Sequence, residues 1–257
     1  MTQIFTPPET RIAIVTGGAR GIGAAIATRL AEDGHDVAIL DLDREQCADS
    51  IRAVEATGRR GMAVSADVSD EDAVRRAVAQ VADTFGPPTV LVNNAGVLRD
   101  ASLSKMTVRD WDFVLDVNLR SAFLMSREME PHFRATRWGR VVNLSSIAAL
   151  GVFGEANYAA AKAGVQGFTK SLAIELGRFG VTANVVAPGF VITEMTREVA
   201  RRVNMSIEDM TKEMMVNNWV GRAGIPEDIA NAVGFFADVR SAFVTGQVLY
   251  VAGGPRG

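Results

Sequence analysis

Short runs rich in valine and isoleucine recur along the chain and alternate with stretches of helical periodicity. Such runs, about five to seven residues long, predict strands that are buried on both faces. They lie at Arg11–Thr16, Asp36–Asp41, Gly61–Ser65, Thr89–Asn93, Arg140–Ser145, Val181–Ala187 and Gln247–Val251. Between the first six runs, apolar residues share one helical face, as Ile22, Ile26 and Leu30 do. A β-α alternation of this kind predicts an α/β fold with a parallel sheet and helices on both faces.

The chain reads as one domain. Its 257 residues show no linker, repeat or low-complexity segment, and a domain of this size can bury a core. Residues 1–10 are expected to be a disordered lead-in, followed by a single domain over residues 11–257. One region, Phe190–Gly224, breaks the alternation and is rich in methionine. It is either a pair of amphipathic helices filling a gap or a mobile lid over a substrate, at about residues 190–224.

Composition excludes several classes of protein. The 27 basic and 30 acidic residues give a net charge of −3, which argues against a nucleic-acid partner. A single cysteine and two distant histidines leave little for a disulfide scaffold or a metal site. No apolar run is long enough for a membrane span, and the N-terminus does not resemble a signal peptide. We therefore expect a soluble, cytoplasmic protein with no metal and no membrane partner.

The first predicted strand leads into a glycine-rich turn and then a helix. The turn contains Gly17, Arg20, Gly21, Ile22 and Gly23. A strand, a glycine turn and a helix N-terminus suit a dinucleotide pyrophosphate, because the backbone can approach closely and free N–H groups face the ligand. The spacing is Gly-x-x-x-Gly-x-Gly, and a purely structural tight turn would look the same.

Asp41 ends the second predicted strand, 18 residues after Gly23. A carboxylate there can accept both hydroxyls of an adenosine ribose and would repel a 2′-phosphate. Arg20 favours NADP(H) instead, since a cation beside the ribose could pair with a 2′-phosphate. The carboxylate at the strand end is closer to the 2′ position, so NAD(H) is favoured over NADP(H). Otherwise Asp41 could be a helix cap and Arg20 a solvated surface charge.

Three further groups follow later strands. Asn93 and Asn94 end the fourth strand, where they could lock neighbouring strands or form a turn. A serine pair ends the fifth strand, and Tyr158 and Lys162 share one helix face at i and i+4.

Lowering a phenol pKa by about three units needs roughly 4 kcal/mol. An ammonium group about 4–5 Å away supplies roughly 3–4 kcal/mol at an effective dielectric constant of about 20. The pair can therefore act as an acid/base unit on a hydroxyl or carbonyl group, with a serine hydroxyl holding the substrate oxygen.

Together these motifs resemble the short-chain dehydrogenase/reductase family over about residues 11–252. The resemblance implies a single-domain, Rossmann-type, doubly wound fold with a seven-stranded, mostly parallel sheet. It also implies a nicotinamide cofactor and a catalytic set of Asn118, a serine, Tyr158 and Lys162, with Lys162 also holding the nicotinamide ribose and Asn118 a water-linked proton relay. The cofactor contacts that it implies are Gly17, Arg20, Gly21, Ile22, Gly23, Asp41, Asp67, Val68, Asn94, Ala95, Gly96, Tyr158, Lys162, Pro188, Gly189, Val191 and Thr193.

The catalytic serine is Ser146 if the strand register decides and Ser145 if the usual spacing of 13 residues to the tyrosine decides. We favour Ser146, because strand register is stiffer than loop length.

Within the family, Ala156–Gly164 and Asn184–Phe190 resemble bacterial 3-oxoacyl-[acyl-carrier-protein] reductases of fatty-acid metabolism. Three features depart from that group, in which NADPH is the usual cofactor. Asp41 favours NAD(H), the carrier-docking arginine pair keeps Arg137 but has Phe179 at its second position, and the segment at 190–224 is longer. The first hypothesis is an oxidoreductase acting on a 3-oxoacyl/3-hydroxyacyl thioester or similar ketone, with an acyl carrier protein as a candidate partner.

Two other hypotheses stay open. One is a catabolic secondary-alcohol, diol or hydroxysteroid dehydrogenase, and the other is a non-catalytic nucleotide-binding regulator. Helical stretches at Trp111–Arg127 and Asn157–Phe179 carry more apolar residues than one buried face needs. The resemblance implies that these stretches, with the C-terminal strand, build a homotetramer.

Overall fold

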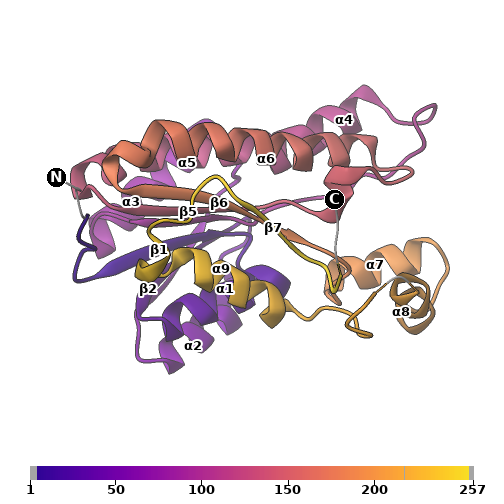
Figure 1. Cartoon of the computed structure of the whole chain (residues 1–257), viewed down its shortest axis with the longest axis horizontal. Coiled ribbons are helices and arrows are strands. Elements are labelled where there is room, and N and C mark those ends of the chain that lie inside the picture. The colour runs from indigo at the N-terminus through magenta and orange to yellow at the C-terminus, as the bar shows by residue number, and fades with distance from the viewer. Residues whose placement is uncertain (1–4, 217, 255–257) are drawn as a thin grey trace.

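The computed structural model describes residues 5–216 and 218–254 and has a seven-stranded sheet at its centre (Figure 1). Across the sheet, the strands are β3 (Gly61–Ser65), β2 (His35–Asp41), β1 (Arg11–Thr16), β4 (Val90–Asn93), β5 (Gly139–Leu144), β6 (Val181–Pro188) and β7 (Val248–Val251). Each neighbouring pair of these strands is parallel. The predicted doubly wound, Rossmann-type fold is therefore confirmed, and each predicted strand agrees with an observed one to within one residue at either end.

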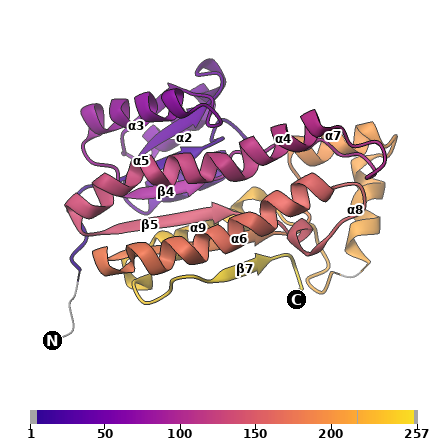
Figure 2. The same ribbon diagram turned by 90° about the horizontal axis from the view of Figure 1, so that it is seen from above.

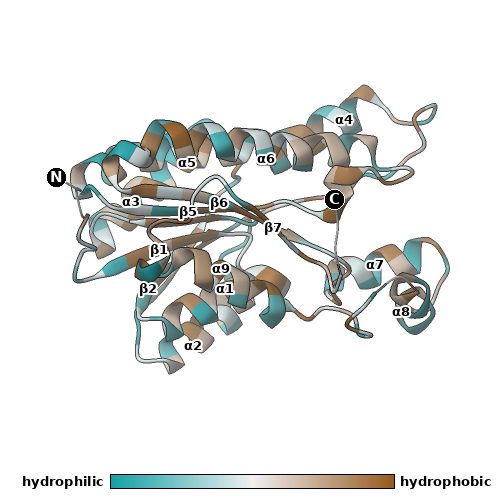
Figure 3. Cartoon of the chain, in the orientation of Figure 1, coloured by the Kyte–Doolittle hydropathy of each residue, from teal (hydrophilic) through white to brown (hydrophobic). Residues whose placement is uncertain are grey.

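Helices cover both faces of the sheet (Figures 1 and 2). One face carries α1 (Gly21–Glu32), α2 (Ala48–Ala56) and α9 (Pro226–Ala237). The other face carries α3 (Glu71–Phe85), α4 (Val108–Leu115), α5 (Ser121–Thr136) and α6 (Ala156–Leu176). Figure 3 shows predominantly hydrophobic strands enclosed between helices of mixed hydropathy. This layering explains why the strand sequences are almost continuously apolar.

Two apolar cores form, one on each face of the sheet, because successive strand residues point to opposite sides. Val15 and Ile39 pack into the core beneath α1 and α9, whereas Ile14 and Leu40 pack into the core beneath α3 and α5. All four side chains are completely buried. A substitution by a polar residue at either set of positions would therefore place an unsatisfied group in a core.

The parallel arrangement brings the carboxyl ends of all strands to one edge of the sheet. The glycine turn after β1, Asp41 at the end of β2, and the chain segments that follow β4, β5 and β6 all meet there. In open α/β sheets, ligands bind outside this edge, at the point where the strand order reverses. Here the reversal lies between β1 and β4.

The methionine-rich segment after β6 forms two short helices, α7 (Glu194–Arg202) and α8 (Ile207–Met215), beyond the carboxyl edge of the sheet (Figure 1). Its ends are tied together, since Val191 forms a parallel bridge with Gly224. The Ile192 N–H donates to the Gly224 carbonyl oxygen over 3.0 Å. The segment therefore leaves the sheet after β6 and returns beside its own start. Both a packed helix pair and a lid are compatible with this arrangement.

The expected lead-in at residues 1–10 lies partly outside the described residues, as do residues 255–257 of the expected domain. Residues 5–10 form no helix or strand. The Phe5 ring packs against the core beneath α1 and lies 5.4 Å below the Arg137 guanidinium. None of the helices in the described ranges has the length and hydropathy of a membrane span.

Candidate active site

The turn between β1 and α1 has a backbone that only glycine adopts easily. Gly17 and Gly21 have positive φ angles of 64° and 58°. A Cβ atom on Gly23 would lie 2.1 Å from the Gly17 carbonyl oxygen, so a side chain there would displace the turn. No side chain of the described residues caps the N-terminus of α1. Its first N–H groups and the helix dipole are therefore available to an anion such as a diphosphate.

Two asparagines bind the end of β4 to its neighbours. Asn93 donates to Asn143 on β5 over 2.7 Å, so it locks the two strands. The Asn94 side chain donates to the carbonyl oxygens of Thr16 and Gly17, at 3.0 and 2.9 Å. Asn94 thereby fixes the glycine turn against β4 and holds open the space beside it.

Asp41 is half-buried at the end of β2 and faces the glycine turn. One carboxylate oxygen accepts the Ala19 N–H over 3.0 Å, and the other accepts the Leu42 N–H over 2.9 Å. Each oxygen keeps a further lone pair, which matches two ribose hydroxyls. Arg20 is exposed at the start of α1.

The remaining expected cofactor contacts surround the same edge. Asp67 is exposed, and its carboxylate accepts hydrogen bonds from the Ser69 N–H and hydroxyl, while Val68 is buried. Gly189 lies so close to the chain after β7 that a Cβ atom would lie 2.7 Å from the Ala252 Cα. Val191 is buried, and Thr193 caps α7 with its side chain about 3.8 Å from the position of a Cβ on Gly21. The start of the 190–224 segment therefore adjoins the glycine turn.

Tyr158 and Lys162 lie on α6, with the Lys162 Nζ 5.4 Å from the centre of the Tyr158 ring. The ammonium group is buried and donates to the Leu144 carbonyl oxygen over 2.9 Å. Burial lowers the pKa of Lys162 to about 8. Burial also raises the pKa of the Tyr158 phenol, and the carboxylates of Glu155 and Asp100 raise it further.

The raised pKa of Tyr158 differs from the lowering by Lys162 that the sequence predicts. The hydrogen bond with Ser146 lowers the pKa of Tyr158, but burial and the two carboxylates outweigh it. The protein groups by themselves therefore favour a protonated phenol. Such a phenol is suited to donating a proton to a carbonyl oxygen.

The two serines after β5 have different surroundings. Ser146 is half-buried, and its hydroxyl accepts the Ala148 N–H over 3.1 Å and lowers the pKa of the Tyr158 phenol. Ser145 is buried, donates to the Lys162 carbonyl oxygen over 2.8 Å and accepts from Gln166 over 3.1 Å. Ser146 therefore faces the phenol, and Ser145 joins β5 to α6.

Asn118 lies in a π-helical turn, Asp116–Arg120, that joins α4 to α5. Its amide donates to the carbonyl oxygens of Val97 and Val114, at 3.0 and 2.9 Å. Its Oδ1 is buried and has no hydrogen-bond partner among the described residues. Turns of this kind interrupt α-helices frequently at functional sites, and the sequence patterns did not predict this one.

Gly96 explains how Asn118 and Lys162 share one space. A Cβ atom on Gly96 would lie 2.6 Å from the Asn118 Oδ1 and 3.5 Å from the Lys162 Nζ. A side chain at this position would therefore displace the Asn118 amide, whereas the Lys162 ammonium group would be in ordinary contact with it. Asn118, Ser146, Tyr158 and Lys162 thus lie around the carboxyl edge of β4 and β5.

Two acidic residues near Tyr158 were not predicted from the sequence. Asp100 follows β4, and Glu155 directly precedes α6. Burial, with a contribution from Asp100, raises the pKa of Glu155 to about 7. In the sequence, only their proximity to motif residues could have indicated a role. Isolated carboxylates are usually solvated surface groups, so this proximity by itself predicts little.

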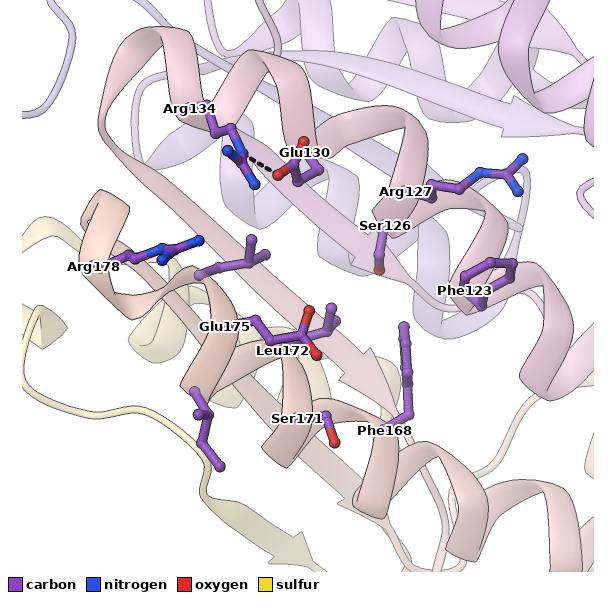
Figure 4. Close-up of a pocket in the computed structure, with 12 residues that line it drawn as sticks. Phe123, Ser126, Arg127, Glu130, Arg134, Phe168, Ser171, Leu172, Glu175 and Arg178 are labelled. Atoms are coloured by element: carbon purple, nitrogen blue, oxygen red, sulfur yellow. Dashed lines mark hydrogen bonds and ion pairs between the residues drawn. The ribbon is translucent and has the colours of Figure 1, made fainter.

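A hollow of about 570 Å³ lies away from this centre, between α5 and α6 (Figure 4). Phe123 of α5 and Phe168 of α6 contact edge to face across it, with ring centres 6.5 Å apart. Arg127, Arg134, Glu175 and Arg178 add charged groups along its length. Ile174 lines the hollow and is 82% exposed. This groove belongs to the two helical stretches that are expected to build an interface.

Comparison with protein families gives one match that covers most of the chain. The family model described as enoyl-(acyl carrier protein) reductase matches residues 17–255. This range includes the glycine turn and the catalytic candidates.

Several curated relatives are similar over nearly their full length. The short-chain reductase protein NovJ of Streptomyces niveus is 43% identical over 98% of this chain and 96% of its own. The BbsD subunit of (2S)-[(R)-hydroxy(phenyl)methyl]succinyl-CoA dehydrogenase of Thauera aromatica is 42% identical over 96% of both chains. The 3-oxoacyl-[acyl-carrier-protein] reductase FabG of Staphylococcus aureus is 40% identical over 95% of this chain and 98% of its own.

The fold also matches a solved structure closely. A crystal structure described as a short-chain alcohol dehydrogenase from Sinorhizobium meliloti superimposes with a TM-score of 0.89 and 32% identity. The match covers 95% of each chain.

Proposed function

The chain belongs to the short-chain dehydrogenase/reductase family of NAD(P)-dependent oxidoreductases acting on CH–OH groups, and on this premise we propose its substrate and cofactor. It is an NAD(H)-dependent enzyme that interconverts a 3-oxoacyl thioester, or a similar ketone, with the corresponding 3-hydroxy compound. The observation that carries the reaction is the Tyr158 phenol beside the buried Lys162 ammonium group, whose Nζ lies 5.4 Å from the ring centre, with the Ser146 hydroxyl near enough to lower the pKa of the phenol.

The substrate class follows from the chemistry named for two relatives. The Staphylococcus aureus enzyme is a 3-oxoacyl-thioester reductase by name, and the Thauera aromatica enzyme acts on a CoA thioester with a hydroxyl group on the third acyl carbon. Both reactions interconvert a ketone and a secondary alcohol at the same position of an acyl thioester. Each relative is at least 40% identical to this chain over nearly its whole length.

The glycine turn and Asp41 fit a nicotinamide dinucleotide. The uncapped N-terminus of α1 holds the diphosphate, and the Asp41 carboxylate accepts the adenosine ribose hydroxyls. Lys162 holds the second ribose. When bound, the nicotinamide supplies or accepts the hydride. Asp41 makes NAD(H) the preferred form, because its charge repels a 2′-phosphate.

Each catalytic side chain has one proposed role. Ser146 donates a hydrogen bond to the substrate oxygen and holds it beside Tyr158. Tyr158 donates its proton to that oxygen during reduction and accepts it during oxidation. Lys162 stabilises the phenolate that results, and Asn118 holds the water that reprotonates it. The Oδ1 of Asn118, which has no partner among the described residues, can accept a hydrogen bond from this water.

An alternative substrate class is a bulkier secondary alcohol, diol or hydroxysteroid. One observation favours it: large apolar side chains are exposed on two segments beyond the carboxyl edge. Phe153, before α6, is 94% exposed, and Trp219, after α8, is 79% exposed. If the segment at about 190–224 closes as a lid, these side chains would contact an apolar substrate.

The proposed assembly is a homotetramer, with the groove between α5 and α6 as one interface. Phe123 and Ile174 expose apolar surface there, and charges of both signs line the same groove. An acyl carrier protein is a candidate partner, since Arg134 and Arg178 both stack on Phe179, within 4.6 and 4.8 Å. These cations would attract the acidic surface of such a carrier.

Oxidation of NADH or NADPH by a panel of ketones tests the proposed function. The panel contains acetoacetyl-CoA, acetoacetyl groups on an acyl carrier protein, ethyl acetoacetate and a cyclic ketone. We expect NADH to be oxidised fastest with a thioester. Preference for the cyclic ketone would support the alternative class. Tight NADH binding without turnover of any ketone would indicate a nucleotide-binding regulator instead.

A further inference from the structure

Glu155 lies one helical turn from the proposed proton donor. It directly precedes α6 and is three residues before Tyr158. Glu155 is the N-cap residue of the helix, with φ −119° and ψ 34°, and Tyr158 lies in the first turn that follows. Glu155 is half-buried, so water screens its charge only partly. A negative charge at this position raises the pKa of the phenol.

A second carboxylate, Asp100, is held in the same place by backbone hydrogen bonds. The Ala101 N–H donates to the Gly154 carbonyl oxygen over 2.9 Å, next to Glu155. The Asn157 amide donates to the Arg99 carbonyl oxygen over 3.0 Å. These contacts join the loop after β4 to the start of α6 on either side of Asp100.

The two carboxylates are poorly compensated. The Asp100 Oδ1 is buried and has no hydrogen-bond partner within the described part of the chain. Burial raises the pKa of Asp100 and of Glu155, and the latter reaches about 7. Both carboxylates also raise the pKa of Tyr158. Geometry and charge therefore agree that the acidic pair opposes formation of the phenolate.

The compensating cation comes from a distant segment. Arg202, the last residue of α7, places its Nη1 3.2 Å from the Asp100 Oδ2. The guanidinium is 44% exposed and the Asp100 side chain 24% exposed. Because α7 belongs to the segment at 190–224, that segment supplies a cation that pairs with Asp100. The charged and titratable groups that face the pair are Arg99, Asp110 and Arg202, which lie beside Asp100, and Tyr158, on which both carboxylates act.

We propose that Glu155 and Asp100 hold the Tyr158 phenol in its protonated, proton-donating form, and that Arg202 weakens this effect when it pairs with Asp100. All three are positioning residues that act through Tyr158. The inference rests on the proposed role of Tyr158 as proton donor. It makes the rate of each direction depend on pH. Ketone reduction needs the phenol, which is present near neutral pH, whereas alcohol oxidation needs the phenolate. Oxidation should therefore require more alkaline conditions.

The direct test is the titration of Tyr158 by carbon NMR, with tyrosine labelled at Cζ and NAD⁺ present at saturation. The chain has only two tyrosines, and Tyr250→Phe assigns the remaining signal to Tyr158. Glu155→Gln removes a charge and keeps the side-chain shape. We expect it to lower the titration midpoint by about one pH unit, as a partly screened charge at this separation would. Asp100→Asn should also lower the midpoint.

Arg202→Gln is made in the Glu155→Gln background, where the midpoint is lowest, and should raise it again. Arg201→Gln in the same background is the matched control, since Arg201 also lies on α7 but pairs with Glu194. Equal midpoints in all variants would overturn the inference. A midpoint that rises in Glu155→Gln would also overturn it.

These results are separate from the proposed function. Ketone reduction by Tyr158→Phe at the wild-type rate would refute the function, whereas the titration reports the charge effect without turnover. A pH profile of oxidation of ethyl 3-hydroxybutyrate adds a second readout. Its alkaline limb should move to lower pH in Glu155→Gln, with kcat for ethyl acetoacetate reduction at pH 7 changed less than 3-fold.

Discussion

The Ser145 hydroxyl donates a 2.8 Å hydrogen bond to the carbonyl oxygen of Lys162. It is thereby engaged with the backbone of α6, whereas the neighbouring Ser146 hydroxyl lowers the pKa of the Tyr158 phenol. The two adjacent serines point to different partners because successive residues at the end of a strand face opposite sides.

Ser146→Ala should therefore reduce kcat for ketone reduction more than Ser145→Ala does. The expected loss is about 10²-fold, because a hydrogen-bond donor to the reacting oxygen is removed. Ser145→Ala should instead lower the unfolding free energy by about 1 kcal/mol. Kinetics at saturating NADH and urea denaturation of both variants provide the comparison. The reverse order in kcat would make Ser145 the catalytic serine.

Tyr158→Phe keeps the ring and removes the proton donor. We expect kcat to fall by about 10²–10⁴, the usual range for a lost general acid, with NADH affinity largely retained. Lys162→Ala should lose both activity and NADH affinity, because the same ammonium group acts on the phenol and the ribose. Fluorescence titration with NADH separates the two effects. Near-normal turnover in Tyr158→Phe would refute the mechanism.

Asp41→Ala should increase the use of NADPH relative to NADH, because it removes the charge that repels a 2′-phosphate. Asp43→Ala is the matched control, since Asp43 is exposed two residues later and bonds only to its own turn. The ratio of kcat/KM for the two cofactors is the measurement. A wild-type preference for NADPH of 10-fold or more, about 1.4 kcal/mol in the wrong direction, would instead make Arg20 the deciding residue.

His35 should make the protein less stable in mild acid. Burial, with Arg11 nearby, lowers its pKa from 6.5 to about 4. At pH values between about 4 and 6.5, His35 binds a proton in the unfolded chain but not in the folded protein. The unfolding free energy is therefore highest above about pH 6.5 and falls as the pH decreases. The expected loss at pH 5 is about 2 kcal/mol. Urea denaturation at pH 7 and pH 5 measures it.

His35→Gln should remove most of this pH dependence. His132→Gln is the comparison: burial also lowers the pKa of His132, but this side chain is only half-buried, so its replacement should remove a smaller part. An unchanged difference between the two pH values in His35→Gln would mean that other groups cause the acid sensitivity.

Ile174→Glu should dissociate the proposed tetramer. The side chain is 82% exposed in the groove between α5 and α6, and a charge there would be buried by a second copy. Leu42→Glu, at a residue 70% exposed after β2, should leave the assembly unchanged. Light scattering at micromolar concentration gives the mass of each variant. A monomeric wild type would contradict the assembly.

The order and bounds of the strands followed from the sequence, because a parallel strand buried on both faces needs an unbroken run of β-branched residues. The glycine turn was also recognisable, since the positive φ angles of Gly17 and Gly21 admit few other residues. Likewise, Tyr158 and Lys162 were predicted to share a helix face because helical spacing alone brings them together.

The tertiary structure decided the rest. The orientation of the Ser146 hydroxyl, the π-turn that carries Asn118 and the Gly96 backbone beside it depend on how separate elements meet. The contact between Asp100 and Arg202 spans 102 residues. Such contacts have no periodicity in the sequence, because loops and helix ends are placed by packing against distant elements. The sequence by itself determined the sheet, the cofactor turn and the Tyr158–Lys162 pair, and only folding set the charge around that tyrosine.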